Sequence, residues 1–304
     1  MSSLPMKEAV RTCLLSTRLK DLFTSISNIE LDGVLRNKAL RNRFMKFSDG
    51  FLSLRKDISM DRFRLGCGPG IDYRKINEWM LWNSRFTCKT LLTLRLFNLP
   101  SLVLTIPTHC CLPKLKVLHL NFLKFSDDES IRRLLSGCNS LEELLVQSCE
   151  LSNLNKLNVC HRTLKRLTIS GGDLAPSCEL EINTPNLVCF DFGYIYCEET
   201  RLLLRNLNSL SEARICIGFI VNRCPCLETL AFELEDFGPG DWRTPKKDPS
   251  CLQNHIKAIK IFALKRKHVE FQLVEYLLKK AGVLESLTVE ITCVHDKERA
   301  ENDE

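Results

Sequence analysis

Apolar residues recur along the chain in a short unit. Each unit has an apolar position, two positions of any type, an apolar position, one position of any type and a final apolar position. Four copies begin at Leu115, Leu141, Leu164 and Leu187, so successive starts lie 26, 23 and 23 residues apart. The last three positions of each copy alternate inward, outward and inward, as in a short strand. One unit cannot close a core alone, so the pattern predicts that successive units stack.

The same unit recurs on both sides of these four copies. It begins at Leu91 upstream and at Leu210, Leu227, Ile256 and Leu284 downstream. A period of about 20–29 residues with this spacing is typical of leucine-rich repeats. The last three spacings, 17, 29 and 28 residues, predict irregular repeats there. The predicted fold class is α/β, a leucine-rich-repeat solenoid whose curved parallel sheet is joined by helical and irregular return segments.

The segments between the repeats predict a few helices. Residues 127–136 show helical spacing, with Ser126 as the expected N-cap and Gly137 as the expected stop. Residues 200–207 predict a second return helix. Residues 72–82 predict a helix in the lead-in, where apolar burial accounts for its tryptophans. Two lead-in strands are expected, at residues 29–32 and 58–65.

Composition bounds the class of protein. A chain of 304 residues with 44% hydrophobic content can bury a large core. Its net charge of +6 comes from 43 basic and 37 acidic residues, which is too balanced to favour nucleic acid as a partner. No apolar run approaches the roughly 20 residues of a membrane span, and no secretory signal is recognisable at the start. We expect neither a nucleic-acid nor a membrane partner.

The 16 cysteines are scattered, and several fall just before a repeat strand, as Cys111, Cys138, Cys160 and Cys224 do. A free cysteine behaves as a small buried hydrophobe, which suits a tight corner. Without a secretory signal, a reducing compartment is favoured over disulfides. The expected location is therefore the cytoplasm, the nucleus or both.

The start of the chain resembles the second half of an F-box. The matching runs are Leu4-Pro5-Met6-Lys7-Glu8-Ala9-Val10 and Leu15-Ser16-Thr17-Arg18-Leu19. They are similar to plant F-box/LRR proteins of the FBD type, although Leu19 and Phe23 stand where the family has tryptophan and the front half of the box is not seen. The resemblance implies docking on a Skp-type adaptor of a cullin-based ubiquitin ligase. The residues it assigns to that docking are Leu4, Pro5, Val10, Leu14, Leu15 and Leu19.

The end of the chain resembles an FBD segment. The match includes Trp242, Cys251-Leu252, Glu275-Tyr276-Leu277-Leu278, Leu284 and Leu287. We expect a strand, a helix and a returning strand here that seal the end of the solenoid. The expected organisation is a helical F-box remnant at 1–25, a lead-in and N-terminal cap at 26–85, repeats at 86–236, an FBD-like cap at 237–295 and a disordered tail at 296–304.

Candidate chemistry is sparse. His109-Cys110-Cys111 and Cys160-His161 are neighbours in sequence, whereas a thiol nucleophile and its base must face each other from separate elements. Cys224-Pro225-Cys226 is one residue too short for a zinc half-site. The basic run from Lys260 to His268 is better explained as a solvated turn. We therefore expect no enzyme activity, no cofactor and no metal.

The outward positions of the repeat strands are the candidate binding surface, since solenoids bind partners on their concave face. The candidates are Arg95, Phe97, His119, Asn121, Glu143, Leu145, Gln147, Arg166, Thr168, Asp191, Arg214 and Lys260. Apolar residues among the outward positions favour a partner, or equally a covering loop. The leading hypothesis is a non-catalytic substrate-recognition adaptor of an SCF-type ubiquitin ligase. The alternatives are a stand-alone repeat module that has lost adaptor binding and, more remotely, a receptor for a small signalling molecule.

Overall fold

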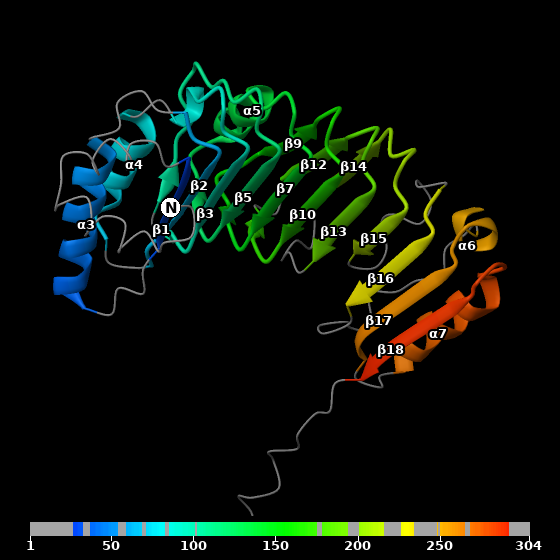
Figure 1. Ribbon diagram of the computed structural model, residues 1–304. Helices are drawn as coiled ribbons and strands as arrows, with labels where there is room; N and C mark the ends of the chain where they lie inside the picture. The colour runs from blue at the N-terminus through cyan, green and yellow to red at the C-terminus, as the bar shows by residue number, and fades with distance from the viewer. Residues whose placement is uncertain are drawn as a thin grey trace, which may run out of the picture. The chain divides into compact units, whose positions relative to one another are not determined.

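The structure is a computed structural model (Figure 1). It divides into two compact units: unit 1 comprises residues 1–184 and 195–205, and unit 2 comprises residues 185–194 and 206–304. The expectations for residues 1–25 and 296–304 lie outside the described residues. The structure describes residues 27–32, 37–53, 59–68, 71–82, 85–100, 102–174, 178–193, 201–215, 226–233, 248, 250–264 and 268–291.

Six parallel strands form the main sheet of unit 1 (Figure 1). In sheet order they are β1 (Asn28–Asp32), β2 (Arg62–Gly66), β3 (Thr93–Phe97), β5 (Val117–Asn121), β7 (Glu143–Gln147) and β10 (Arg166–Ser170). The register places Leu94, Leu118, Leu144 and Leu167 in one row across β3, β5, β7 and β10. The predicted stack of repeat units is therefore confirmed. Both lead-in strands belong to the same sheet, which thus starts before residue 86.

Alternation of side chains explains why these segments form strands with one buried face. In β3, β5 and β7 the second and fourth residues are buried and the first, third and fifth are not. The leucine that opens each unit is also buried, with Leu91, Leu115, Leu141 and Leu164 each 0% exposed. These leucines seat the chain where it enters the strand, so each repeat contributes three apolar residues to one continuous core.

Shorter strands line the return side of unit 1. Four two-residue strands pair in parallel: β4 (Val103–Leu104), β6 (Lys124–Phe125), β8 (Glu150–Leu151) and β11 (Asp173–Leu174). A third parallel sheet contains β9 (Lys156–Cys160), β12 (Glu179–Asn183) and β14 (Arg201–Arg205).

The helix predicted at residues 200–207 was wrong, because that segment is strand β14. Its neighbour β12 offers a parallel ladder in which Leu180 pairs with Leu202 and Ile182 with Leu204. Leu204 is buried whereas Leu203 is only partly covered. This two-residue alternation and the backbone hydrogen bonds available from β12 outweigh the helix propensity of a segment rich in leucine and arginine.

The main return helix of unit 1 is α5 (Asp128–Ser136), close to its prediction. Its N-cap is Asp127 and not Ser126: the Asp127 carboxylate accepts a hydrogen bond from the Ser130 backbone N–H at 2.6 Å. The Ser126 hydroxyl lies instead against the Leu104 carbonyl and the Ser130 hydroxyl. Gly137 ends the helix as predicted. Its backbone is right-handed, with φ −77°, and glycine is needed there because a Cβ would lie 2.7 Å from the Cys110 carbonyl oxygen.

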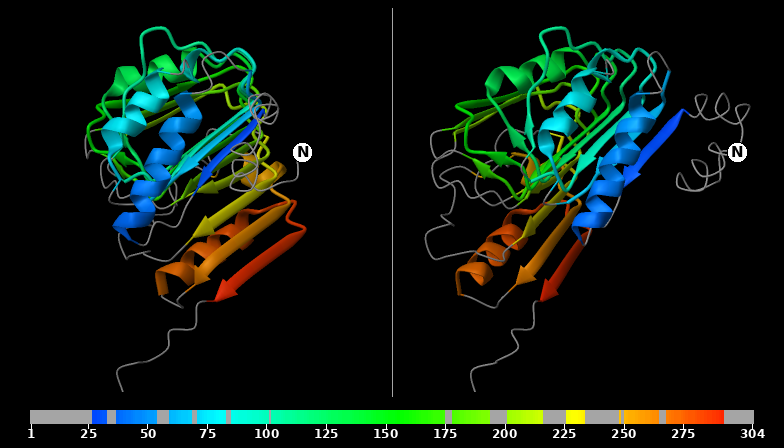
Figure 2. Two further views of the ribbon diagram at one scale, coloured as in Figure 1. Left: turned by 60° about the vertical axis from the view of Figure 1, so that its left-hand side comes forward. Right: turned by 90° about the vertical axis from the view of Figure 1, so that its left-hand side faces the viewer.

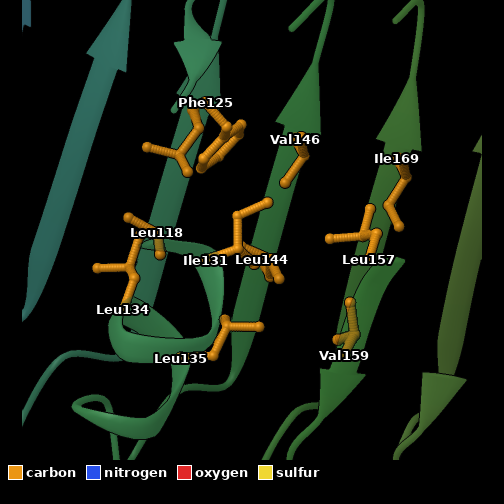
Figure 3. Close-up of a pocket in the computed structure, with 11 residues that line it drawn as sticks. Leu118, Phe125, Ile131, Leu134, Leu135, Leu144, Val146, Leu157, Val159 and Ile169 are labelled. Carbon is orange, nitrogen blue, oxygen red and sulfur yellow. The ribbon is translucent and has the colours of Figure 1, made fainter. Parts of the chain in front are cut away.

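The core beneath α5 is tightly packed. Figure 3 shows a cavity between α5, the main sheet and β9. Its lining consists of apolar side chains only. Its volume is about 10 Å³, close to the space of one water molecule. Leu118 and Leu144 close it from the main sheet, Ile131 and Leu134 from the helix, and Leu157 from β9. An apolar void of this size stays dry and cannot hold a small signalling molecule.

Two helices flank the first strands of unit 1. They are α3 (Lys38–Ser53) and α4 (Tyr73–Trp82), followed by a short 3-10 turn at Arg85–Thr87. Figure 2 shows α3 and α4 side by side next to β1 and β2. The Trp79 indole donates to the Asp49 carboxylate at 3.1 Å and so joins α4 to α3. Ile76 and Trp79 are 0% and 4% exposed, which confirms that burial accounts for this tryptophan.

Unit 2 has a five-stranded parallel sheet and two helices. Its strands in order are β13 (Cys189–Gly193), β15 (Glu212–Ile215), β16 (Thr229–Glu233), β17 (Ala258–Leu264) and β18 (Ser286–Ile291). The helices are α6 (Ser250–Asn254) and α7 (His268–Lys280). Helix α7 confirms the helix expected in this segment, and its Leu273, Tyr276 and Leu277 are buried. The Tyr276 hydroxyl donates to Asp248, and burial with this hydrogen bond raises its pKa to about 12.

The last described strand of unit 2 is exposed to solvent. All six residues of β18 are exposed, and Leu287 and Val289 are 37% and 38% exposed. Both lie in register with the buried Ile259 and Ile261 of β17, so they face the core side of the sheet. Within the described residues no segment packs over that side at β18, and therefore its apolar side chains remain in contact with solvent.

Candidate functional site

Parallel register gathers the outward side chains of unit 1 into rows. The middle row runs Arg64, Arg95, His119, Leu145 and Thr168 on β2, β3, β5, β7 and β10. Adjacent strands lie about 4.8 Å apart, so each side chain is within reach of the next. Beside this row the same strands carry Phe97, Asn121 and Gln147 at their ends and Glu143 and Arg166 at their starts. We call this surface the unit 1 face. It contains nine of the candidate residues, from Arg95 to Thr168.

A charged network spans three strands of the unit 1 face. Glu143 on β7 lies between His119 on β5 and Arg166 on β10. One carboxylate oxygen is 2.5 Å from His119 Nε2, and the other accepts hydrogen bonds from Arg166 Nη2 at 2.6 Å and Nε at 3.0 Å. Partial burial raises the pKa of Glu143, but the hydrogen bonds from Arg166 and His119 outweigh it and leave the pKa lowered. Glu143 is thus an ionised carboxylate already satisfied by its neighbours.

The ends of the strands carry amide and aromatic groups. The Asn121 amide donates to the Gln147 side-chain oxygen at 3.0 Å. Phe97 is the last residue of β3, as Asn121 and Gln147 are of β5 and β7, and it is half-buried. Leu145, also half-buried, sits between His119 and Thr168. The unit 1 face therefore combines charged, amide and apolar groups on a rigid sheet.

The remaining strand candidates lie in unit 2. Asp191 on β13 is paired in register with Arg214 on β15, and Lys260 lies on β17. The Arg214 guanidinium stands over the Phe262 ring at 5.1 Å, a cation–π contact. These residues share the outward side of the unit 2 sheet. The adaptor-docking candidates Leu4 to Leu19 lie outside the described residues.

Sequence reasoning missed a cluster on β2. Arg64, Gly66 and Phe97 form a stack in which the Arg64 guanidinium lies 4.3 Å from the centre of the Phe97 ring. The ring rests on Gly66, where an added Cβ would meet Phe97 Cζ at 2.2 Å. The sequence does carry a signal for this strand, because polar and apolar residues alternate from Arg62 to Leu65. However, no leucine stands three residues before Phe63, where the other repeat units begin with an apolar leucine or isoleucine.

The cysteine–histidine pairs serve structural roles. His161 Nε2 lies 2.5 Å from the Cys138 carbonyl, and its other nitrogen lies 3.2 Å from the Thr163 hydroxyl. Burial lowers the pKa of His161 and raises that of the neighbouring Cys160. Burial likewise raises the pKa of Cys110 to about 11. A raised pKa keeps a thiol protonated and unreactive at neutral pH.

The corner role of cysteine is only partly right. Cys138 and Cys149 are buried, and the Cys149 thiol lies against the Leu120 carbonyl at 3.5 Å. Cys111 and Cys160 are exposed, and Cys160 is the last residue of strand β9, at a position that alternates with the buried Val159. The described residues contain no group of three or more potential ligands that could hold a metal ion. None of the helices in the described ranges is both long and apolar enough to cross a bilayer.

The stacked parallel strands, with entry leucines and short return strands, define a leucine-rich-repeat protein. In comparisons with known families, residues 114–139 match the Leucine Rich Repeat family and residues 244–289 match the FBD family. The chain therefore contains leucine-rich-repeat and FBD segments and is similar to F-box/FBD/LRR-repeat proteins of plants, which confirms the resemblance seen in its sequence.

The relatives are proteins of Arabidopsis thaliana. A putative FBD-associated F-box protein is 24% identical over 98% of this chain and 89% of its own length. A putative F-box/FBD/LRR-repeat protein is 30% identical over 71% of this chain. That match covers 48% of the relative, so the chain spans about half of it. An FBD-associated F-box protein is 25% identical over 97% of this chain. No solved structure matches the chain.

Proposed function

We propose that this chain is a non-catalytic substrate-recognition adaptor of an SCF-type cullin ubiquitin ligase. Its relatives carry F-box in their names, and residues 4–19 resemble the part of an F-box that docks on a Skp-type adaptor. The unit 1 face would hold the target protein, and the outward residues of unit 2 are separate candidates for target contacts. Ubiquitin transfer would be performed by other subunits, so the chain needs no cofactor of its own.

The observation that carries the target-binding part is the unit 1 face itself. Six strands present a surface on which His119, Glu143 and Arg166 are fixed by hydrogen bonds, beside partly exposed Leu145 and Phe97. A mixed polar and apolar surface of this kind fits the anatomy of a protein interface. Small molecules favour deep concave pockets, and the cavity lined by Leu118 is too small for one.

Adaptor binding is tested with purified components. We expect the 304-residue chain to bind a plant Skp-type adaptor in isothermal titration calorimetry. The variant Leu15→Asp should abolish that binding, because a charge in the apolar docking run would be buried without a partner. A matched change on the exposed side of α5, Arg132→Asp, should leave it intact. If the chain shows no binding, it acts as a stand-alone repeat module and the ligase proposal fails.

Target binding is tested on the unit 1 face. With a target in hand, Arg166→Ala should weaken its binding about tenfold, a loss of about 1.4 kcal/mol. The melting temperature should stay unchanged, because Arg166 is exposed and a surface ion pair contributes little to stability. Arg132→Ala, on the opposite side of the unit, serves as the control. Equal binding by both variants would exclude the unit 1 face as the target site.

The proposed place of action is the cytoplasm or the nucleus. A fluorescent fusion of the chain in plant cells tests this. Signal restricted to the secretory pathway would contradict the proposal, since it would remove the chain from cullin ligases and from the reducing conditions that its free thiols favour.

A further inference from the structure

Three basic side chains stand side by side on the unit 1 face. Arg64, Arg95 and His119 occupy the middle position of β2, β3 and β5, and the register pairs each with the next. Like charges directly opposite one another on neighbouring strands destabilise a sheet. Arg64 and Arg95 form such a pair, and an anion bound beside Arg95 would relieve their repulsion.

Arg95 is the member of this row without an internal counter-ion. Its side chain is exposed and makes no ion pair or hydrogen bond with any residue in the described part of the chain. The nearest acidic group beyond His119 is Glu143, and both of its oxygens are already taken by His119 and Arg166. The guanidinium of Arg95 therefore has its hydrogen-bonding capacity open to a ligand.

Phe97 and Gly66 build a wall next to Arg95. The end of the Phe97 ring occupies the space that a side chain at Gly66 would fill, and the Arg64 guanidinium lies over the ring at 4.3 Å from its centre. Stacking on an aromatic ring limits the conformational freedom of a guanidinium. Arg64 is thus held in place beside Arg95, in the manner of a preorganised site.

We propose that Arg95, with Arg64 and His119 beside it and Phe97 as an apolar wall, binds the carboxylate of an acidic side chain in an extended segment of the target protein. A guanidinium pairs with a carboxylate through two parallel hydrogen bonds, which gives both charge and direction. The proposal deepens the target-binding role of the unit 1 face and rests on it.

Charge on either side of the row argues for a single carboxylate. Glu30 on β1 lies beside Arg64 in register, and Glu143 follows on the other side of His119. The positive field is therefore confined to about two strand spacings, or about 10 Å. A polyanion such as duplex nucleic acid would place further charges against these glutamates. A protein segment with one acidic residue places its carboxylate against Arg95, and its neutral residues lie against Glu30 and Glu143 without repulsion.

The probe is a fluorescein-labelled peptide of about ten residues, long enough to cross the strands, that alternates glutamate with serine. Binding to the full chain is followed by fluorescence anisotropy. A version of this peptide that keeps only its central glutamate, with serine at the other glutamate positions, matches the proposed single carboxylate and is the deciding probe. We expect it to bind measurably, with a loss of about tenfold or more for Arg95→Gln and no change for the control Arg132→Gln. A peptide with glutamine in place of glutamate should not bind.

Two further variants separate charge from geometry. Arg95→Lys keeps the charge but loses the planar fork, so its affinity should fall between those of wild type and Arg95→Gln. Gly66→Ala changes no charge but displaces the Phe97 ring, and it should weaken peptide binding several-fold. Because Arg95→Gln removes repulsion with Arg64, it should leave the melting temperature of the free chain unchanged or raised. A lowered melting temperature would make Arg95 structural and overturn the proposal.

Other outcomes would also overturn it. Equal affinity of wild type and Arg95→Gln, or failure of the glutamate peptide to bind at millimolar concentration, removes the site. Tighter binding of a matched phosphoserine peptide, lost in Arg95→Gln, reassigns it to phosphate. These results are independent of adaptor docking. If the chain binds the peptide but no Skp-type adaptor, the carboxylate site stands and the ligase role fails. If it binds the adaptor but not the peptide, only the carboxylate site fails.

Discussion

At the scale of single residues, the position directly after four of the main strands of unit 1 requires a left-handed backbone conformation. Asn98, Phe122, Ser148 and Gly171 follow β3, β5, β7 and β10 directly, and all four have φ between 50° and 61°. The corner is held by the ladder, as the Phe122 N–H donates to the Gln147 carbonyl at 3.0 Å. Glycine and asparagine adopt this left-handed conformation readily, whereas a bulky aromatic residue does so at a cost.

Replacing Phe122 tests that cost. Its side chain is 49% exposed, so only about half of the ring's burial is at stake on substitution. We expect Phe122→Asn to raise the free energy of unfolding by about 0.5–1 kcal/mol, because asparagine tolerates positive φ. The reciprocal change Asn98→Phe should lower it by a similar amount. Urea denaturation measures both, and a loss of stability in Phe122→Asn would show that the aromatic ring contributes more through contacts than its backbone costs.

At the scale of elements, the return side of unit 1 shows how neighbours select structure. Helix α5 forms where Asp127 can cap it and Ile131, Leu134 and Leu135 can face the core. The equivalent segment one repeat later is the strand β9, which pairs with β12. Both segments are apolar on one side, and the choice between them depends on which neighbour offers a ladder. A helix prediction from local periodicity succeeded for α5 and failed at β14 for this reason.

The Asp127 cap of α5 should make the stability of the protein depend on pH. The backbone hydrogen bond from Ser130 lowers the pKa of Asp127 below its usual value. A carboxyl group whose pKa is lower in the folded state stabilises the protein above its unfolded pKa, and this contribution disappears as the pH falls through the folded pKa. Asp127→Ala should therefore cost about 1 kcal/mol at neutral pH and less at acidic pH, below about 4.

Thermal unfolding across this pH range checks the cap. Asp127→Asn is the matched control, since asparagine caps a helix nearly as well but does not titrate. Ser126→Ala tests the rival position and should cost less than Asp127→Ala at neutral pH. A larger loss in Ser126→Ala, or a pH-independent loss in Asp127→Ala, would contradict the assigned cap.

At the scale of the whole molecule, a solenoid must close each end of its core. In unit 1 the helices α3 and α4 flank the first strands, and Trp79 is buried there. In unit 2 the last strand, β18, leaves Leu287, Val289 and Ile291 between 37% and 50% exposed. The described part of the FBD-type segment therefore extends the parallel sheet and leaves the core-facing side chains of its last strand partly exposed.

A pair of residues in register tests this open end. Ile259 is 1% exposed and Leu287, its partner on β18, is 37% exposed. Ile259→Ala should lower the free energy of unfolding by about 2–5 kcal/mol through cavity formation. Leu287→Ala should cost less than about 1 kcal/mol, since much of that side chain is already in water. Equal costs in calorimetry at low protein concentration would mean that β18 is covered in solution.

The sequence by itself determined the repeat register. A leucine such as Leu144 has to lie inward wherever its segment forms a strand, and a 23-residue spacing allows the next unit to repeat the same path. The candidate surface followed from the same alternation, because residues between buried ones must point outward. Helix α4 and the apolar stripe of α7 were likewise readable from local spacing.

Only the tertiary structure decided what depends on neighbours from distant parts of the chain. It made residues 201–205 a strand, since β12 supplies the ladder. It placed Arg64 beside Arg95 and laid Phe97 on Gly66, because parallel pairing joins β2 to β3 across 31 residues of sequence. Local periodicity fixes which side of a strand faces water, but the identity of the adjacent strand fixes which side chains meet there.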